Sequence, residues 1–103
     1  MKLTMICAVL VLFGAATTRA QGDAKELYMS KCATCHGPDG AGKTAMGKKL
    51  KVQGAQVAAG KMSADEMVKI VTNGKGQDMN GYGKQFSAEQ IKGLVDYYRS
   101  LGK

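Results

Sequence analysis

Two cysteines and a histidine stand close together in the run Cys32-Ala-Thr-Cys35-His36. Thiols three positions apart lie on one turn of a helix, where each can form a thioether with a vinyl group of haem. The imidazole that follows can then reach the iron. This spacing is the attachment signal for c-type haem. The run therefore predicts one covalent haem, held through Cys32 and Cys35, with His36 as one axial ligand to the iron.

The same residues could serve other sites. An exported cysteine pair can form a disulfide or act as a dithiol module without haem, although the adjacent histidine and the lack of a βαβ pattern disfavour a thioredoxin-like role. A structural zinc site needs four nitrogen or sulfur ligands. The segment after residue 20 offers only two cysteines and the single histidine of the chain. Haem attachment is the interpretation that uses all three residues.

The first 20 residues are typical of a secretory signal peptide. A short basic start precedes an apolar run without charge over residues 3–14, and a stretch of small and polar residues ends at Ala20. The run is too short to span a bilayer comfortably, so we expect cleavage after Ala20, with retention as an anchor as the alternative. Residues 21–103 then form one exported domain in the periplasm.

The predicted mature segment is small and basic. Of 15 lysine and arginine residues, Lys2 and Arg19 lie in the signal peptide. The remaining basic residues outnumber the 8 acidic residues by 5, so the segment has a net charge of about +5. So small a domain buries only about 60% of its unfolded surface, and a haem would give it a large apolar surface to fold around. Positive surface charge steers association with acidic partners. For an exported haem protein we expect acidic redox proteins as partners, with an anionic membrane surface as the alternative, and no nucleic acid.

Caps and apolar periodicity predict three helices and no strand. The first begins near Asp23 and runs into the cysteine motif. The second begins after Ser63 and ends at Gly74, and the third begins after Ser87 and ends at Gly102. A Glu or Gln follows each of these caps three residues later, which is the pattern of a capping box. The third helix carries an apolar stripe at helical spacing, formed by Ile91, Leu94, Val95, Tyr98 and Leu101.

Glycine-rich connections join these helices over residues 37–47, 54–60 and 74–83. Long irregular loops in so small a domain usually serve function, and glycine lets a backbone approach a ligand closely. We expect the loops to wrap a flat cofactor, with a further short helical turn over residues 57–61. Four lysines follow the motif in what reads as a solvated loop, and they could instead ring an exposed haem edge for docking: Lys43, Lys48, Lys49 and Lys51.

The iron has a sixth position that a methionine thioether could fill, which would raise the reduction potential and suit electron transfer. Met29 precedes the motif on the proximal helix, and Met46 follows it too closely. Met62 and Met67 fit a hydrophobic staple at the second helix. Met79 stands in the last glycine-rich connection without apolar periodicity around it. Met79 is therefore the predicted second axial ligand, although it could also cover the haem edge only.

Three further residues have predicted supporting roles. Pro38 is the only proline, and its carbonyl is well placed to accept a hydrogen bond from the second ring nitrogen of His36. A simple turn after the helix would also explain this proline. Tyr28 and Tyr82 could pack on the haem or hydrogen-bond to it, and core packing is the favoured interpretation for Tyr28.

The pattern resembles the class I c-type cytochromes, of the small bacterial monohaem type that is c6/c553-like or cbb3-subunit-like. Residues 27–40 are similar to the family's first helix and attachment site, Met79 falls where the family places its axial methionine, and residues 89–101 are similar to its C-terminal helix. The resemblance implies an all-α fold around one covalent haem. It also implies a monomeric one-electron carrier outside the cytoplasm, which exchanges electrons with other redox proteins.

One position departs from the family. Proline is common directly after the axial methionine, and this chain has Asn80 there. The alternative function is a haem enzyme or a gas sensor, which would need an open or labile sixth position on the iron. The sequence has no second histidine, and we find no distal arginine and no acid–base pair for such chemistry. We therefore expect a carrier with no substrate at the iron.

Overall fold

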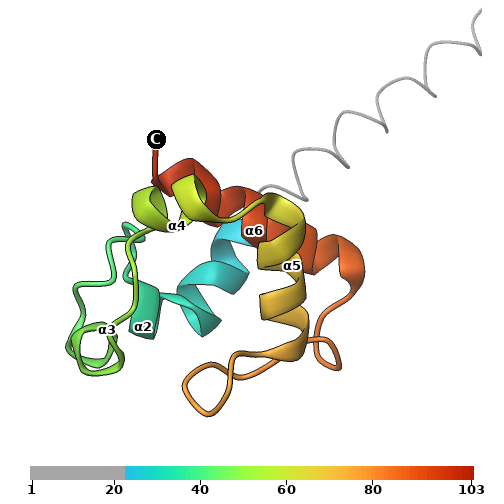
Figure 1. Cartoon of the computed structure of the whole chain (residues 1–103). Helices are drawn as coiled ribbons and strands as arrows, with labels where there is room; N and C mark the ends of the chain where they lie inside the picture. The colour runs from blue at the N-terminus through green and yellow to red at the C-terminus, as the bar shows by residue number, and fades with distance from the viewer. Residues whose placement is uncertain (1–22) are drawn as a thin grey trace, which may run out of the picture.

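The computed structural model describes residues 23–103, so the predicted signal peptide and its cleavage site lie outside the described residues. Every regular element within this range is helical (Figure 1). The first helix covers residues 23–31 of it. Five more follow: α2 (Ala33–His36), α3 (Ala45–Leu50), α4 (Ala55–Lys61), α5 (Ala64–Asn73) and α6 (Ala88–Leu101). The predicted all-α class is confirmed. Nowhere between residues 23 and 103 is a helix both long and apolar enough to cross a membrane.

Capping boxes begin α5 and α6, as the sequence predicts. The backbone N–H of Glu66 donates to the Ser63 hydroxyl at 3.2 Å, and the backbone N–H of Ser63 donates to the Glu66 carboxylate at 3.0 Å. Ser87 and Gln90 repeat the arrangement at 3.1 and 2.8 Å. Each box satisfies backbone donors that the first helical turn leaves unpaired. The predicted ends are also confirmed, because Gly74 and Gly102 are the C-terminal caps.

Two short helices differ from the prediction. α4 covers Ala55–Lys61 and is longer than the turn expected over residues 57–61. α3 lies in a segment predicted to be a loop, and Thr44 caps it by accepting a hydrogen bond from the backbone N–H of Gly47 at 2.9 Å. Lys48 and Lys49 are therefore helical. The prediction failed there because Gly47 reads as a helix breaker in so short a segment.

The longest of these helices, α6, is the centre of the fold. Both α4 and α5 pack against it (Figure 1). The first helix reaches it through Tyr28, whose ring lies 5.2 Å from that of Tyr97 and 6.3 Å from that of Tyr98, between centroids. Tyr28 is only 1% exposed, and Ile91 and Val95 of α6 are 2% exposed. The core packing predicted for Tyr28 and for the α6 stripe is confirmed.

Candidate haem-binding site

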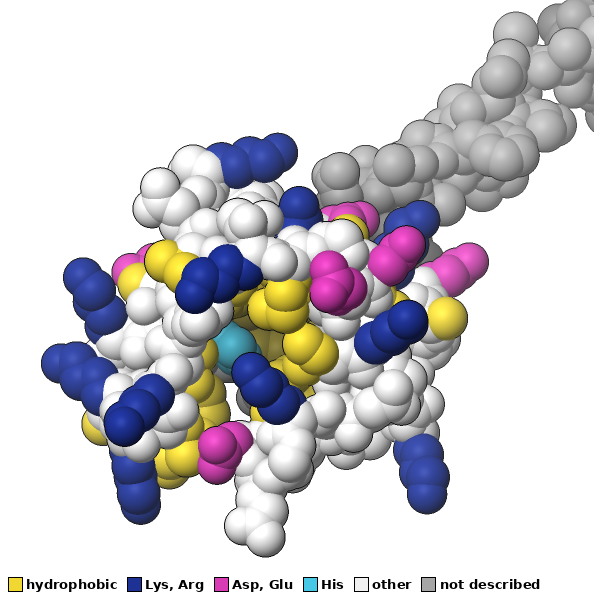
Figure 2. All heavy atoms as spheres, in the orientation of Figure 1, with side chains coloured by type: hydrophobic (Ala, Val, Ile, Leu, Met, Phe, Trp, Pro, Cys, Tyr) yellow, Lys and Arg dark blue, Asp and Glu magenta, His cyan; other side chains and the backbone are white. Residues whose placement is uncertain are grey.

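A cavity of about 350 Å³ opens between the cysteine motif and the turn that carries Met79. Its volume lies in the range of small-molecule and cofactor sites. Figure 2 shows this hollow, with the histidine side chain inside it and hydrophobic side chains around it. The predicted attachment residues Cys32 and Cys35 and the predicted ligands His36 and Met79 all line the cavity. α5 and α6 add apolar walls: Ile70, Val71, Leu94 and Val95.

The motif reaches the cavity because the first helix continues almost directly into α2. A turn at Cys32 joins them, with hydrogen bonds from the Cys32 N–H to the Tyr28 carbonyl (2.8 Å) and from the His36 N–H to the Cys32 carbonyl (2.9 Å). Both thiols are free. Burial, with a smaller contribution from Cys35, raises the pKa of the Cys32 thiol to about 11. This thiol is therefore protonated at neutral pH.

The His36 imidazole is largely enclosed. Burial lowers its pKa, so the neutral ring, which is the form that binds metals, is favoured. The ring of Tyr98 meets it edge-on, with 5.2 Å between centroids. The Nδ1 atom of His36 is buried and has no hydrogen-bond partner among the described residues. The structure thus does not contain the expected bond to the Pro38 carbonyl, and the role of Pro38 stays a prediction.

Residues 42–47 donate hydrogen bonds to the backbone carbonyls of the cysteine motif. The Thr44 hydroxyl donates to the Thr34 carbonyl at 2.7 Å and lies 3.1 Å from the Cys35 carbonyl. The backbone N–H of Gly42 donates to the His36 carbonyl at 2.8 Å. A side chain on Gly47 would overlap the Cys35 carbonyl oxygen, so α3 approaches the motif as closely as a glycine allows. These contacts fix the direction in which Cys35 and His36 project.

Met79, which also lines the cavity, stands in a hydrogen-bonded turn. The Lys75 N–H donates to the Met79 carbonyl at 2.9 Å, and the Met79 N–H donates to the Lys75 carbonyl at 3.3 Å. The chain that follows is tied to the end of α5, because the Tyr82 N–H donates to the Val71 carbonyl at 2.8 Å. Gly76 provides the positive φ (+58°) that the turn requires. Backbone contacts thus hold the segment that lacks proline at position 80.

The other methionines separate into two groups. Met29 and Met46 are 39% and 41% exposed, and they are not among the residues that line the cavity. Met62 and Met67 do line it. Met67 is only 5% exposed in the helical core, where the Arg99 guanidinium approaches its sulfur at 3.8 Å. The predicted packing role of Met67 is confirmed, and the choice of Met79 as ligand stays a prediction.

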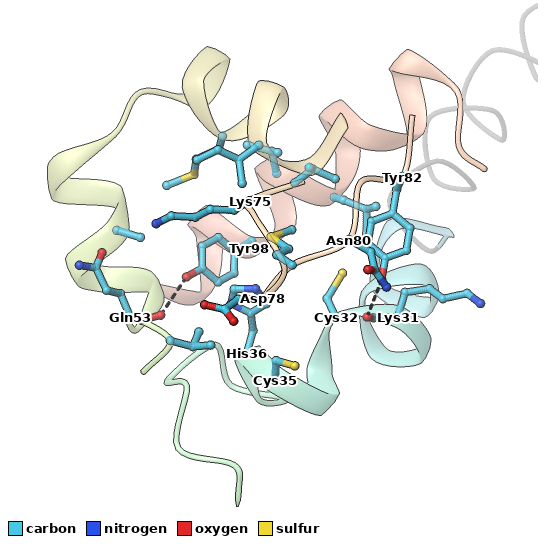
Figure 3. A pocket seen from close by; sticks show the side chains of 18 of the residues that line it. Lys31, Cys32, Cys35, His36, Gln53, Lys75, Asp78, Asn80, Tyr82 and Tyr98 are labelled. Atoms are coloured by element: carbon cyan, nitrogen blue, oxygen red, sulfur yellow. Dashed lines mark hydrogen bonds between the residues drawn. The ribbon is translucent and has the colours of Figure 1, made fainter. Parts of the chain in front are cut away.

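Two tyrosines close the sides of the cavity. Tyr82, for which the sequence favoured no role, stacks on Phe86 with 5.4 Å between ring centroids, and its hydroxyl lies 3.5 Å from the Lys31 carbonyl of the first helix. Tyr98 lines the opposite side and donates to the Gln53 carbonyl at 3.3 Å (Figure 3). Sequence reasoning missed Tyr98 as a site residue, although its place in the α6 stripe pointed inward.

These residues fit a covalent haem. Two free thiols, a neutral imidazole and a thioether line one cavity whose walls are largely apolar. The Nδ1 atom of His36 is buried without a partner among the described residues, so no hydrogen bond of the core accounts for the position of this ring. Such a donor set, with a single imidazole and a thioether in one cavity, is that of haem iron.

Comparison with known proteins agrees with this fit. Residues 19–97 match the sequence profile described as cytochrome C oxidase, cbb3-type, subunit III. The chain belongs to this family. It is 36% identical over 93 residues to the cbb3-type cytochrome c oxidase subunit FixP of Azorhizobium caulinodans, a match over 88% of this chain. The chain spans about a third (31%) of the length of that relative.

A solved structure shares both the fold and the size of the chain. The KustC0563 c-type cytochrome superposes with a TM-score of 0.71 at 29% sequence identity, over 79% of this chain and 99% of that protein. The predicted resemblance to small monohaem class I cytochromes is confirmed. The domain is therefore a c-type cytochrome, an electron-transfer domain that binds haem covalently.

Proposed function

We propose that Cys32 and Cys35 attach the haem, that His36 and Met79 bind its iron, and that the domain carries single electrons between other redox proteins. One observation carries the proposal: these four side chains line the same cavity. His36 comes from the end of α2, and Met79 comes from the turn between α5 and α6.

The residues that line the cavity would orient the haem, and the apolar ones among them would reduce its contact with water. When bound, the haem supplies a one-electron Fe(III)/Fe(II) couple. The Thr44 and Gly42 contacts hold the backbone that carries His36, and the paired backbone of Lys75 holds that of Met79. Because both ligands stand on hydrogen-bonded backbone, both can stay in place in either oxidation state, which keeps the reorganisation small. Pro38 would accept a hydrogen bond from His36 and so orient the imidazole.

A carrier explains the site better than an enzyme does. With the Met79 thioether in the sixth position, no site for a substrate is left at the iron. We therefore propose that the domain is not an enzyme by itself, and that it acts as a monomer on the periplasmic side of the membrane. Its relative FixP is a subunit of a cbb3-type oxidase. Electron exchange with the redox centres of such a complex is the corresponding role here.

The positive charge of the chain supports docking to acidic surfaces. The lysines after the motif lie on or beside α3 and are all exposed: Lys43, Lys48, Lys49 and Lys51. The last of them lines the cavity. The rate of electron exchange with an acidic redox protein should fall as ionic strength rises, and it should fall less steeply in a variant with these lysines replaced by glutamine. A rate that does not depend on salt would contradict this docking surface.

Attachment can be tested by mass spectrometry of the exported protein. In a host with the attachment machinery, we expect one haem per chain in the wild type and none bound covalently in Cys32→Ala/Cys35→Ala. The purified wild type should then exchange one electron per haem with a redox protein. Protein without covalent haem under these conditions would revive the dithiol-module interpretation.

A further inference from the structure

The cavity has an apolar middle and a polar rim. Apolar side chains of α5 and α6 form the middle. In Figure 3, Lys31 lies on the same side as Cys32, whereas Gln53 and Lys75 extend on the opposite side of the cavity. The polar and charged residues that line the cavity include one carboxylate and several side chains that can donate hydrogen bonds: Lys31, Lys51, Gln53, Lys75, Asp78 and Asn80.

This division corresponds to the chemistry of haem. The macrocycle carries its two vinyl groups along one edge and its two propionates along the opposite edge. Thioethers at Cys32 and Cys35 fix the vinyl edge, so the propionate carboxylates must face away from both cysteines. Carboxylates that are partly removed from water need hydrogen-bond donors or cations as partners. The side of Gln53 and Lys75 offers an amide and an ammonium group.

We propose that Gln53 and Lys75 form the site that binds the haem propionates. The proposal rests on the attachment of haem through Cys32 and Cys35 given above. Both residues are exposed at the rim and also line the cavity, so their polar groups can reach the edge of a bound macrocycle. The Tyr98 hydroxyl holds the backbone of Gln53 in place at 3.3 Å.

Lys75 links this site to the proposed iron ligand. Its backbone makes both hydrogen bonds of the pair with Met79, at 2.9 and 3.3 Å. An ammonium group on a propionate would therefore anchor the turn from which Met79 projects. The carboxylate of Asp78 also lines the cavity and would repel the propionates. Lys75 supplies the positive charge that offsets this repulsion.

Resonance Raman spectroscopy of the purified holoprotein tests the assignment, because the wavenumber of the propionate bending mode depends on the hydrogen bonds that the propionates accept. Lys75→Gln and Gln53→Ala should each shift this mode to lower wavenumber, and Lys75→Arg should keep it near the wild-type value. Lys31→Gln is the matched control, since it removes the same charge on the cysteine side of the same cavity. It should leave the mode unchanged.

Two results would overturn the site: a mode that stays at its wild-type position in both Lys75→Gln and Gln53→Ala, or one that moves equally in Lys31→Gln. The far-red absorption band of Met–Fe(III) haem, recorded on the same samples, separates this proposal from the ligand assignment. If the wild type lacks that band but Lys75→Gln shifts the propionate mode, only Met79 is wrong. If the band is present and the mode does not move, only the propionate site is wrong.

Discussion

Gly81 controls how closely the Met79 turn approaches the end of α5. A Cβ atom built at Gly81 would lie 2.7 Å from the backbone carbon of Asn73 and 2.7 Å from the carbonyl oxygen of Thr72. These are backbone atoms of α5, which cannot rotate away as a flexible side chain could. Gly81→Ala must therefore push the turn outward. Overpacking of this kind costs about 1–3 kcal/mol.

This cost destabilises the state in which Met79 is bound to iron, relative to the state in which Met79 has dissociated from it. A penalty of about 1–3 kcal/mol corresponds to a change of about 5- to 150-fold in that equilibrium. Added imidazole competes for the same coordination position, so its apparent Kd should fall by this factor in Gly81→Ala. The far-red Met–Fe(III) band should weaken in parallel. Both quantities come from one absorbance titration of the ferric protein.

Gly60→Ala is the matched control. Gly60 lies in α4, and a Cβ atom there would meet no atom within 4 Å. This variant should bind imidazole as the wild type does, and alanine should stabilise the helix by about 0.5–1 kcal/mol. The reasoning is refuted if Gly81→Ala keeps the wild-type imidazole affinity and a full far-red band, or if Gly60→Ala changes them to the same extent.

Three further predictions concern stability. Thr44→Val removes the α3 cap and the bonds to the motif carbonyls, so urea denaturation should show a loss of about 1–2 kcal/mol that Thr44→Ser restores. An unchanged midpoint would contradict a stabilising role for these Thr44 hydrogen bonds. Tyr28→Phe leaves the buried Gly37 carbonyl without the hydroxyl that donates to it at 2.7 Å and should cost about 1–3 kcal/mol in the same assay, whereas no loss would show that this bond is unimportant. The hydrogen bond from the Ser63 backbone holds the pKa of the Glu66 carboxyl below its ordinary value, so the contribution of the ionised carboxylate to stability is complete above that ordinary value and disappears as pH falls through the lowered pKa. The difference in Tm between wild type and Glu66→Gln should therefore narrow on acidification from pH 7, and a difference independent of pH would contradict it.

Local signals predicted most of the helices. The capping boxes at Ser63 and Ser87 pair the free backbone donors of the first helical turn with side chains a few residues away. The local sequence therefore contains the information that starts these helices. Gly47 is the contrary case. It is required because α3 approaches the Cys35 carbonyl, which is a tertiary contact with no local pattern. A prediction from local propensity therefore gave a loop where the structure has α3.

Most residues of the candidate site were likewise predicted from the sequence. Spacing alone identified Cys32, Cys35 and His36, since covalent attachment needs that pattern on one helical turn. Met79 followed from its isolation among glycines, and the structure places it at the cavity together with Met62 and Met67. The part played by Tyr98 depends on how α6 crosses the motif. No spacing along the chain encodes that crossing.

The absorption spectrum of the ferric holoprotein tests the central claim most directly, when the wild type is compared with Met79→Ala and with Met62→Ala as the control. The account predicts a low-spin spectrum with the far-red methionine–iron band in the wild type and in Met62→Ala. Met79→Ala should lose the band. A high-spin wild-type spectrum, or a band that survives in Met79→Ala, would contradict haem ligation by His36 and Met79.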